Sequence, residues 1–264
     1  MLPFSSSGIL LRRTEYGDYD WIPTFLTLSH GKLPMMAKYA RKSRKRFSGT
    51  LELFSEIGFI GGYPRKGGMP ILQEAWIKQP FAGIRGDLVK TAYAAYWSEL
   101  VLSWLEEGKA QPKIYHLLRY ALAALEEAPA GSGESGISPG VASIVFQLYF
   151  LLASGLSPDF EKCSRCGMAL DRMPGEKCGF DLEKGGLVCQ KCIPERALPY
   201  PLSKGTVKQL RWVQAGPLQK VGRLRFTAAA IAESLAFLEA FVPYHLGREP
   251  KSQKFLTHVR RLKA

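Results

Sequence analysis

The stretch GILLRRTEYGDYDWIPTFLTLSHGK, residues 8–32, decides how the N-terminal part of the chain folds. Gly17-Asp18 separates its two apolar runs, and His30-Gly31 follows the second run, as expected for tight turns between strands. Similar runs continue along the chain and predict five strands at residues 7–13, 21–28, 32–39, 49–60 and 70–78. Five short strands in about eighty residues favour a small closed barrel of the OB-fold type.

The apolar spacing becomes helical beyond residue 81. It predicts helices near residues 88–105, 114–125, 141–153, 227–246 and 252–263. In the first of these, Tyr93, Tyr96 and Trp97 share the face of the leucines, so we assign them to the core rather than to a ligand. Gly247 is the expected C-terminal stop of the fourth helix, and Pro243 is expected to kink or shorten its last turn.

Four of the five cysteines form two CxxC pairs that are separated by 22 residues. A CxxC turn places two sulfurs on one side of a metal ion, and four thiolates complete the tetrahedral coordination that zinc prefers. The sequence therefore predicts a single structural zinc ion (Zn2+) with no open position for catalysis, bound by Cys163, Cys166, Cys189 and Cys192. Cys178 has no CxxC partner, and we expect it not to be a ligand. Because this segment has few apolar residues, it is expected to lack a core of its own and to loosen when zinc is removed.

These patterns predict a multidomain fold, in which an N-terminal five-stranded OB-fold β-barrel is followed by an all-α C-terminal domain with an inserted four-cysteine zinc finger. The expected boundaries are residues 1–80 for the OB-fold domain, 81–158 for the first part of the helical domain, 159–200 for the zinc-binding insertion and 201–264 for the last helical part.

The charge of the chain is unevenly distributed. There are 36 Lys and Arg residues against 23 Asp and Glu, a net charge of +13. Residues 1–80 carry +6 and residues 201–264 carry +9, whereas residues 81–158 carry −2 and residues 159–200 are neutral. Such a basic chain favours polyanionic partners, nucleic acid first and an anionic membrane surface second. If both ends bind one polyanion, the fold must bring them to one surface.

Two clusters of basic residues are the candidate nucleic-acid contacts. The first, KYARKSRKR at residues 38–46, has six basic residues and no acid between two predicted strands, and the second, which also contains Lys220, precedes the long C-terminal helix. The candidate DNA-binding residues, with two from the first strand, are Arg12, Arg13, Lys38, Arg41, Lys42, Arg44, Lys45, Arg46, Lys204, Lys208, Arg211, Arg223 and Arg225. The alternative for the first cluster is a solvated loop or a targeting tag.

Two aromatic residues lie near the two ends of the first cluster, Tyr39 within it and Phe47 directly after it. Tyr39 and Phe47 could each stack on nucleic-acid bases or belong to the barrel core. Contacts to the phosphate backbone and by stacking do not depend on base sequence, so we expect binding without sequence specificity.

Several other classes of protein are not expected. No run of about 18 apolar residues predicts a membrane span. Residues 1–11 have no basic region before their apolar run, and the cysteine count is odd, so we expect a cytoplasmic protein without a secretory signal or structural disulfides. No phosphate-binding loop, dinucleotide-binding glycine motif or HExxH motif occurs, and the four histidines are scattered, so we expect no enzyme.

An ordered set of motifs resembles the RecO family of bacterial DNA-repair and recombination mediators. The motifs are GILLRRTEYGDYD at residues 8–20, TFLTLSHGK at 24–32, AKYAR at 37–41 with FSGTLELF at 47–54, the cysteine quartet, and FVPYHLG at 241–247 with Lys251-Ser252 and Phe255-Leu256. They extend over nearly the whole chain and are densest near its two ends.

The resemblance implies an N-terminal OB-fold, a helical C-terminal domain and a zinc ion between helices. It also implies binding to single- and double-stranded DNA and annealing of complementary strands. With the partner RecR and single-stranded DNA-binding protein (SSB), whose C-terminal tail such proteins bind, the family helps to load RecA. A nucleoid-associated cytoplasmic protein is therefore expected. The alternatives are an RNA-binding OB/zinc protein and a protein-binding scaffold without nucleic-acid activity.

Overall fold

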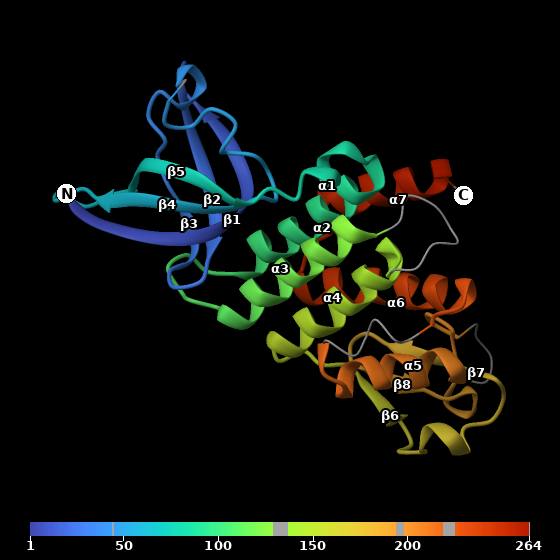
Figure 1. Cartoon of the computed structure of the whole chain (residues 1–264). Coiled ribbons are helices and arrows are strands. Elements are labelled where there is room, and N and C mark those ends of the chain that lie inside the picture. The colour runs from blue at the N-terminus through green and yellow to red at the C-terminus, as the bar shows by residue number, and fades with distance from the viewer. Residues whose placement is uncertain (44, 129–136, 194–197, 219–224, 264) are drawn as a thin grey trace. The chain divides into compact units, whose positions relative to one another are not determined.

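The computed structural model describes residues 1–43, 45–128, 137–193, 198–218 and 225–263 (Figure 1). The chain forms two compact units, one made of Met1–Glu126 with Pro250–Ala264 and the other of Glu127–Glu249. Both ends of the chain thus belong to the first unit. Among the described residues, no helix is both long and apolar enough to cross a membrane.

The first unit contains the predicted five-stranded sheet. Its strands are antiparallel in the order β3-β2-β1-β4-β5, and they are β1 (Leu2–Tyr16), β2 (Asp20–Thr27), β3 (Gly31–Pro34), β4 (Glu56–Tyr63) and β5 (Ile71–Gln79). The long strand β1 pairs with β4 over its first half and with β2 over its second half. The register shifts at Leu11, which explains why Ile9, Leu10 and Leu11 are all buried in spite of strand alternation.

The predicted closure of this sheet into a barrel was wrong. Among the described residues, only an isolated bridge joins the two edges, where the amide of Met36 donates to the carbonyl of Pro70 at 2.8 Å. Beyond Pro34 the chain still contacts β2, through the bond from the Met35 amide to the Pro23 carbonyl at 3.0 Å and the bridge between Trp21 and Ala37. Because Pro23 and Pro34 have no N–H, this pairing is not a regular ladder. The strand expected at 32–39 is therefore shortened to Gly31–Pro34.

The strand expected at residues 49–60 begins only at Glu56. Phe47, Leu51 and Phe54 are buried, but they reach the core from turns rather than from a strand. Gly49 and Phe54 have φ values of 65° and 70°, which lie in the left-handed region that a strand does not use.

Helices complete the first unit. They are α1 (Ala82–Gly86), α2 (Leu88–Trp104), α3 (Pro112–Glu127) and α7 (Lys251–Lys263). Tyr93, Tyr96 and Trp97 are buried, which confirms their assignment to the core. The C-terminal helix α7 packs on α2, and the Glu99 carboxylate of α2 accepts hydrogen bonds from the amides of Lys251 (3.0 Å) and Ser252 (2.8 Å). This carboxylate satisfies amides that the first turn of a helix leaves free.

In the part of the second unit that the structure describes, three α-helices combine with a second sheet. The helices are α4 (Pro139–Ala153), α5 (Lys204–Ala215) and α6 (Ala228–Leu246). The sheet has the order β6-β8-β7-β9 and consists of β6 (Asp159–Cys163), β7 (Lys177–Asp181), β8 (Gly186–Val188) and β9 (Leu202–Ser203). Helix α6 continues past Pro243 and stops at Gly247, whose φ of 68° confirms the expected stop.

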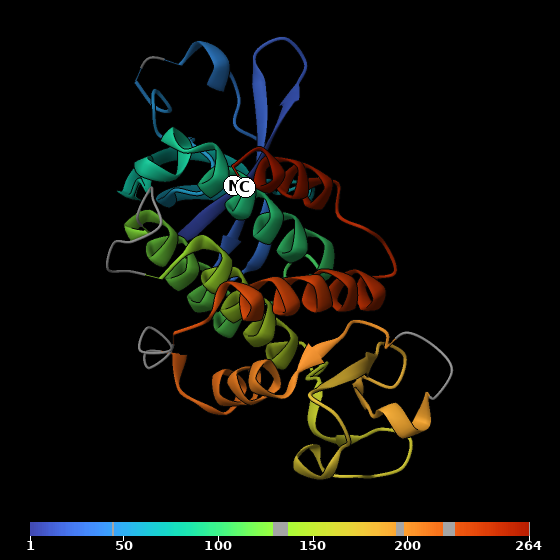
Figure 2. The ribbon, with the colours of Figure 1, turned by 90° about the vertical axis from the view of Figure 1, so that its right-hand side faces the viewer.

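The cysteine-bearing segment shares a core with helix α6. Phe160 of β6 and Phe180 of β7 are buried against Phe237 and Phe241 of α6, with the Phe180 and Phe237 ring centroids 4.3 Å apart (Figure 2 shows this sheet beside the helices of the second unit). The number of apolar residues within the segment does not reveal this core, because α6 supplies half of its aromatic residues.

Candidate metal centre and nucleic-acid interface

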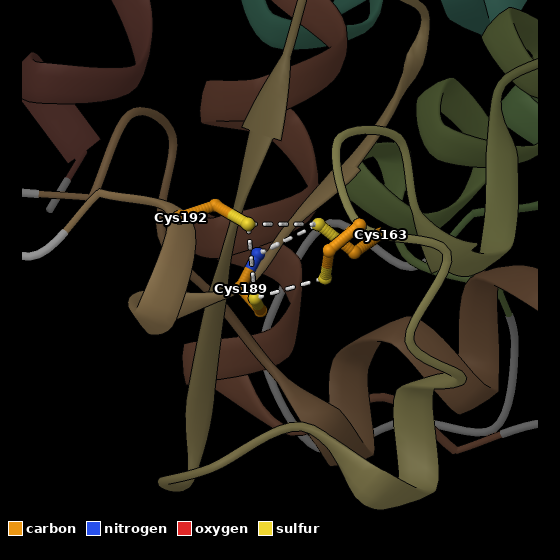
Figure 3. Close-up of side chains that lie close together, drawn as sticks. Cys163, Cys189 and Cys192 are labelled. Carbon is orange, nitrogen blue, oxygen red and sulfur yellow. Dashed lines mark hydrogen bonds between the residues drawn. The ribbon is translucent and has the colours of Figure 1, made fainter.

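The structure brings the four CxxC cysteines together. Figure 3 labels three of them, Cys163, Cys189 and Cys192. Cys163 ends β6, Cys166 lies in the turn that follows, Cys189 directly follows β8, and Cys192 ends the short 3-10 helix η3 (Gln190–Cys192). Gly167, with φ of 73°, closes the first turn by donating its amide to the carbonyl of Cys163 at 2.9 Å. Each CxxC turn therefore presents its two sulfurs to the same point.

The spacing of the sulfurs fits a tetrahedral metal ion. The Sγ–Sγ distances are 3.9 Å between Cys163 and Cys192, 3.7 Å between Cys166 and Cys189, and 3.6 Å between Cys189 and Cys192. Four thiolates at the usual Zn–S distance of about 2.3 Å lie about 3.8 Å from one another. The four cysteines can hold a metal ion without a large movement of the backbone.

The surroundings of the sulfurs favour a bound cation. Burial opposes ionisation of Cys163, but amide hydrogen bonds, including one from Cys189 at 3.4 Å, hold the pKa of the Cys163 thiol down to about 6. The adjacent sulfurs of Cys189 and Cys166 raise the pKa of Cys192 to about 12. Four sulfurs in such proximity ionise together only when a cation neutralises them.

Cys178 is not part of this cluster. It is buried in β7, and its sulfur faces the carbonyl oxygen of Leu202 at 3.7 Å. Burial raises the pKa of the Cys178 thiol to about 11, as for an unreactive cysteine of the core. All five cysteines are free of disulfides.

The first basic cluster forms a loop on the surface of the first unit, and we call residues 38–46 the basic loop. Lys38, Arg41, Lys42, Lys45 and Arg46 are exposed, whereas Arg44 lies outside the described residues. The loop is anchored by Ala40 and Phe47, which belong to the core of the sheet. Of the two flanking aromatic residues, Phe47 is therefore a core residue, and Tyr39 is 62% exposed.

The cations of the basic loop differ in their partners. Arg41 pairs with Glu15 at 3.4 Å, but among the described residues Lys38, Lys42, Lys45 and Arg46 form no ion pair. The guanidinium of Arg46 donates to the carbonyl of Lys38 at 2.9 Å, which holds the two ends of the loop together. Most of the positive charge of the loop is thus available to a ligand.

The two candidates on β1 also differ. Arg12 is exposed. Arg13 is half-buried, donates to the carbonyl of Leu51 at 2.7 Å, and lies 4.1 Å from the centroid of the Trp21 ring. Arg13 therefore holds the strand and the following turns together.

Three cations of the second basic cluster lie on α5, and each has a partner nearby. Lys204 donates to the carbonyl of Met173 at 2.7 Å, Lys208 pairs with Asp171 at 3.0 Å, and Arg211 pairs with Glu161 at 2.6 Å. Arg225 is exposed, and Lys220 and Arg223 lie outside the described residues.

Two exposed aromatic residues that lie beside the candidate basic residues were not identified from the sequence. Tyr19 lies beside Tyr39, and Trp212 lies beside Arg211 on α5 in a shallow hollow that Lys208 also lines. The available signals were the position of Tyr19 between two aspartates in a turn and the position of Trp212 off the apolar stripe of its helix.

The fold and the site define a class of proteins in which a five-stranded β domain with a basic loop precedes a helical unit with a four-cysteine metal centre. Residues 1–81 match the family model for the N-terminal part of recombination protein O, and residues 85–254 match the model for its C-terminal part.

Similar proteins agree with these matches. The chain is 44% identical to the DNA repair protein RecO of Desulfosudis oleivorans, over 97% of this chain and 98% of the relative. It is 41% identical to that of Desulfatibacillum aliphaticivorans over 99% of each chain, and 29% identical to that of Bacillus pumilus over 98% of this chain and 95% of the relative. The chain belongs to the RecO family, and its role lies in DNA repair and recombination.

Proposed function

We propose that this protein is a non-enzymatic recombination mediator that binds single- and double-stranded DNA and anneals complementary strands. The observation that carries the proposal is the basic loop, because buried residues hold it in place while Lys38, Lys42 and Lys45 remain exposed and without acidic partners among the described residues. Cations in this arrangement release the counterions of a phosphate backbone, so the affinity for DNA should decrease as salt increases.

The annealing step follows from the same electrostatics. Two complementary strands repel each other, and cationic side chains that bind both reduce this repulsion. We assign the main phosphate contacts to the basic loop and Arg12, and weaker contacts to Lys204, Lys208 and Arg211, whose charge is shared with local partners. This proposal includes the prediction that the two basic ends of the chain bind the same DNA molecule.

The proposed metal is a single structural zinc ion. The separation of the sulfurs matches that of four thiolate ligands, and four ligands leave no position for a reactive water molecule. Zinc would then fix the ends of β6 and β8 and would take no part in a reaction.

Membership of the RecO family supports the partners and the compartment of this proposal. RecR and SSB are the proposed protein partners, and loading of RecA onto SSB-coated DNA in the cytoplasm, in association with the nucleoid, is the proposed outcome.

A strand-annealing assay with and without SSB tests the proposal. The wild-type protein should accelerate annealing of complementary oligonucleotides under both conditions, and added sodium chloride should reduce the acceleration. Competition at fixed salt between single-stranded DNA, duplex DNA and RNA separates this function from RNA binding. An affinity for DNA that ignores salt, together with no acceleration of annealing, would leave a protein-binding scaffold as the better description.

A further inference from the structure

Two exposed tyrosine rings stack on each other, one in the basic loop and one in a neighbouring turn. Tyr19 comes from the turn between β1 and β2, and Tyr39 precedes the 3-10 helix η1 (Ala40–Lys42). Their ring centroids are 6.4 Å apart with an interplanar angle of 15°, and the residues are 39% and 62% exposed. Each ring therefore retains accessible surface, and the planes of the two rings are nearly parallel.

The backbone holds both rings in place. Tyr39 has a φ of 57°, a left-handed conformation that is uncommon for a bulky residue, and its amide donates to the carboxylate of Asp20 at 2.7 Å. The amide of Arg41 donates to the carbonyl of Tyr19 at 3.0 Å. These bonds connect the turn to the basic loop, so a ligand would find the rings already positioned. Strained backbone of this kind is concentrated at functional sites.

Cations surround the aromatic pair. The ammonium of Lys42 lies 3.7 Å from the centroid of the Tyr19 ring, Arg41 donates to the carbonyl of Asp18 at 3.2 Å, and Lys38 is exposed directly before Tyr39. A flat aromatic surface beside cations is the combination that binds single-stranded nucleic acid, because bases stack on the ring while phosphates contact the charges.

We propose that Tyr39, supported by Tyr19, is the site where an unpaired base of single-stranded DNA stacks. This inference rests on the proposed function and makes it more specific. The bases of a duplex already stack on one another, so a duplex can contact the cations of the loop but not Tyr39 without unpairing. Tyr39 would thus favour single strands, and pairing during annealing would withdraw the base from the ring.

The test compares the affinities of variants for a single-stranded oligothymidylate and for a hairpin duplex at one salt concentration. Tyr39→Asn removes the ring but retains a residue that accepts the left-handed backbone, whereas Tyr39→Phe keeps the ring. Tyr39→Asn should weaken single-strand binding about fivefold or more and change duplex binding by less than about twofold, while Tyr39→Phe should bind as the wild type does. The salt dependence of single-strand binding should be unchanged, since no phosphate contact is removed.

Tyr200→Asn is the matched control, because Tyr200 is also exposed, at 37%, and has a φ of 44° but lies far from the basic loop in the sequence. It should bind both DNA forms as the wild type does. Equal losses for single strands and duplex in Tyr39→Asn would make Tyr39 a support of the loop and overturn the inference, as would unchanged single-strand binding.

A measurement on the wild-type protein does not depend on the folding of any variant. Stacking on Tyr39 should change the fluorescence of 2-aminopurine placed in the oligothymidylate, and the absence of any change on binding would contradict the inference. If the wild-type protein itself neither binds DNA in a salt-dependent manner nor anneals strands, the proposed function has failed. Salt-dependent binding without a contribution from Tyr39 would refute only the stacking site.

Discussion

The basic loop and helix α5 carry similar charges but use them differently. In the loop, apolar side chains such as Phe47 hold the chain in place, and Lys38, Lys42 and Lys45 project without an acidic partner among the described residues. On α5, Lys204, Lys208 and Arg211 contact the carbonyl of Met173 and the carboxylates of Asp171 and Glu161, which all belong to the cysteine-bearing segment. Net charge alone therefore does not locate an interface, because the local partners of each cation determine how much of its charge is available to a ligand.

Loss of the metal should produce the largest difference between the two regions, because it should destabilise the unit that contains α5 and leave the unit that contains the basic loop unchanged. Cys192→Ala should abolish zinc binding and destabilise the second unit by on the order of 5 kcal/mol, because structural zinc contributes directly to folding. The contacts of the α5 cations should then become more dynamic, and the first unit should be unaffected. Zinc content and amide hydrogen exchange measure both effects.

The matched control for this experiment is Cys178→Ala, which should retain about one zinc ion per chain because Cys178 lies outside the cluster. Unchanged hydrogen exchange in β6 and β8 after chelation would show that the aromatic residues around Phe180 suffice to hold the segment, and that the metal does not.

Removal of cations should have the second-largest effect, and it should reduce DNA binding more in the basic loop than on α5. The triple substitution Lys38→Ala, Lys42→Ala and Lys45→Ala should weaken DNA binding about tenfold or more and reduce the slope of log affinity against log salt by about one for each lost phosphate contact. The corresponding triple substitution of Lys204, Lys208 and Arg211 should weaken DNA binding less and lower the Tm of the second unit instead. Salt titrations of DNA binding and thermal unfolding distinguish the outcomes, and equal losses of affinity would remove the proposed difference.

A decrease in pH should have the smallest effect on stability, through a carboxylate that contacts the start of α5. Glu233 of α6 is partly buried, which opposes its ionisation, but its carboxylate accepts from the Thr206 hydroxyl (2.6 Å) and the Ser203 amide (2.9 Å) and pairs with Lys177 at 3.1 Å. These contacts hold the pKa of Glu233 below its usual value.

Because this pKa is lower in the folded state, the ionised carboxylate stabilises the protein above the pKa of the unfolded chain. The stabilisation is lost as pH falls through the folded pKa. We expect Glu233→Gln to show a weaker acid dependence of urea unfolding than the wild type between about pH 6 and about pH 3. Parallel curves for the two proteins would contradict this role.

Local patterns predicted several parts of the structure correctly. Helices α2, α3, α4, α6 and α7 followed from apolar spacing. The burial of Trp97 followed from the face it shares with leucines, and the stop at Gly247 followed from the left-handed backbone that glycine accepts. The two CxxC pairs predicted a four-sulfur cluster, because each pair needs only a local turn to orient its sulfurs.

Other features depend on residues that are distant in the sequence. Leu51 and Phe54 indicated a strand because apolar residues in a buried turn have the same composition as those in a strand. Among the described residues, the two edges of the sheet meet only at the bridge between Met36 and Ile71, a pairing that strand patterns do not reveal. Ser252 bonds to Glu99, 153 positions earlier, which no short-range pattern could predict.

The sequence by itself determined the main helices of this protein, its basic ends and the four cysteines that could hold a metal ion, since these depend on residue types at short, fixed spacings. Only the tertiary structure decided which cations remain available and which aromatic rings are exposed. The physical reason is that both properties depend on neighbours from other elements. Acidic side chains of the cysteine-bearing segment pair with cations of α5. The core of the first sheet buries Phe47, whereas Tyr39 lies beside Tyr19 at the surface.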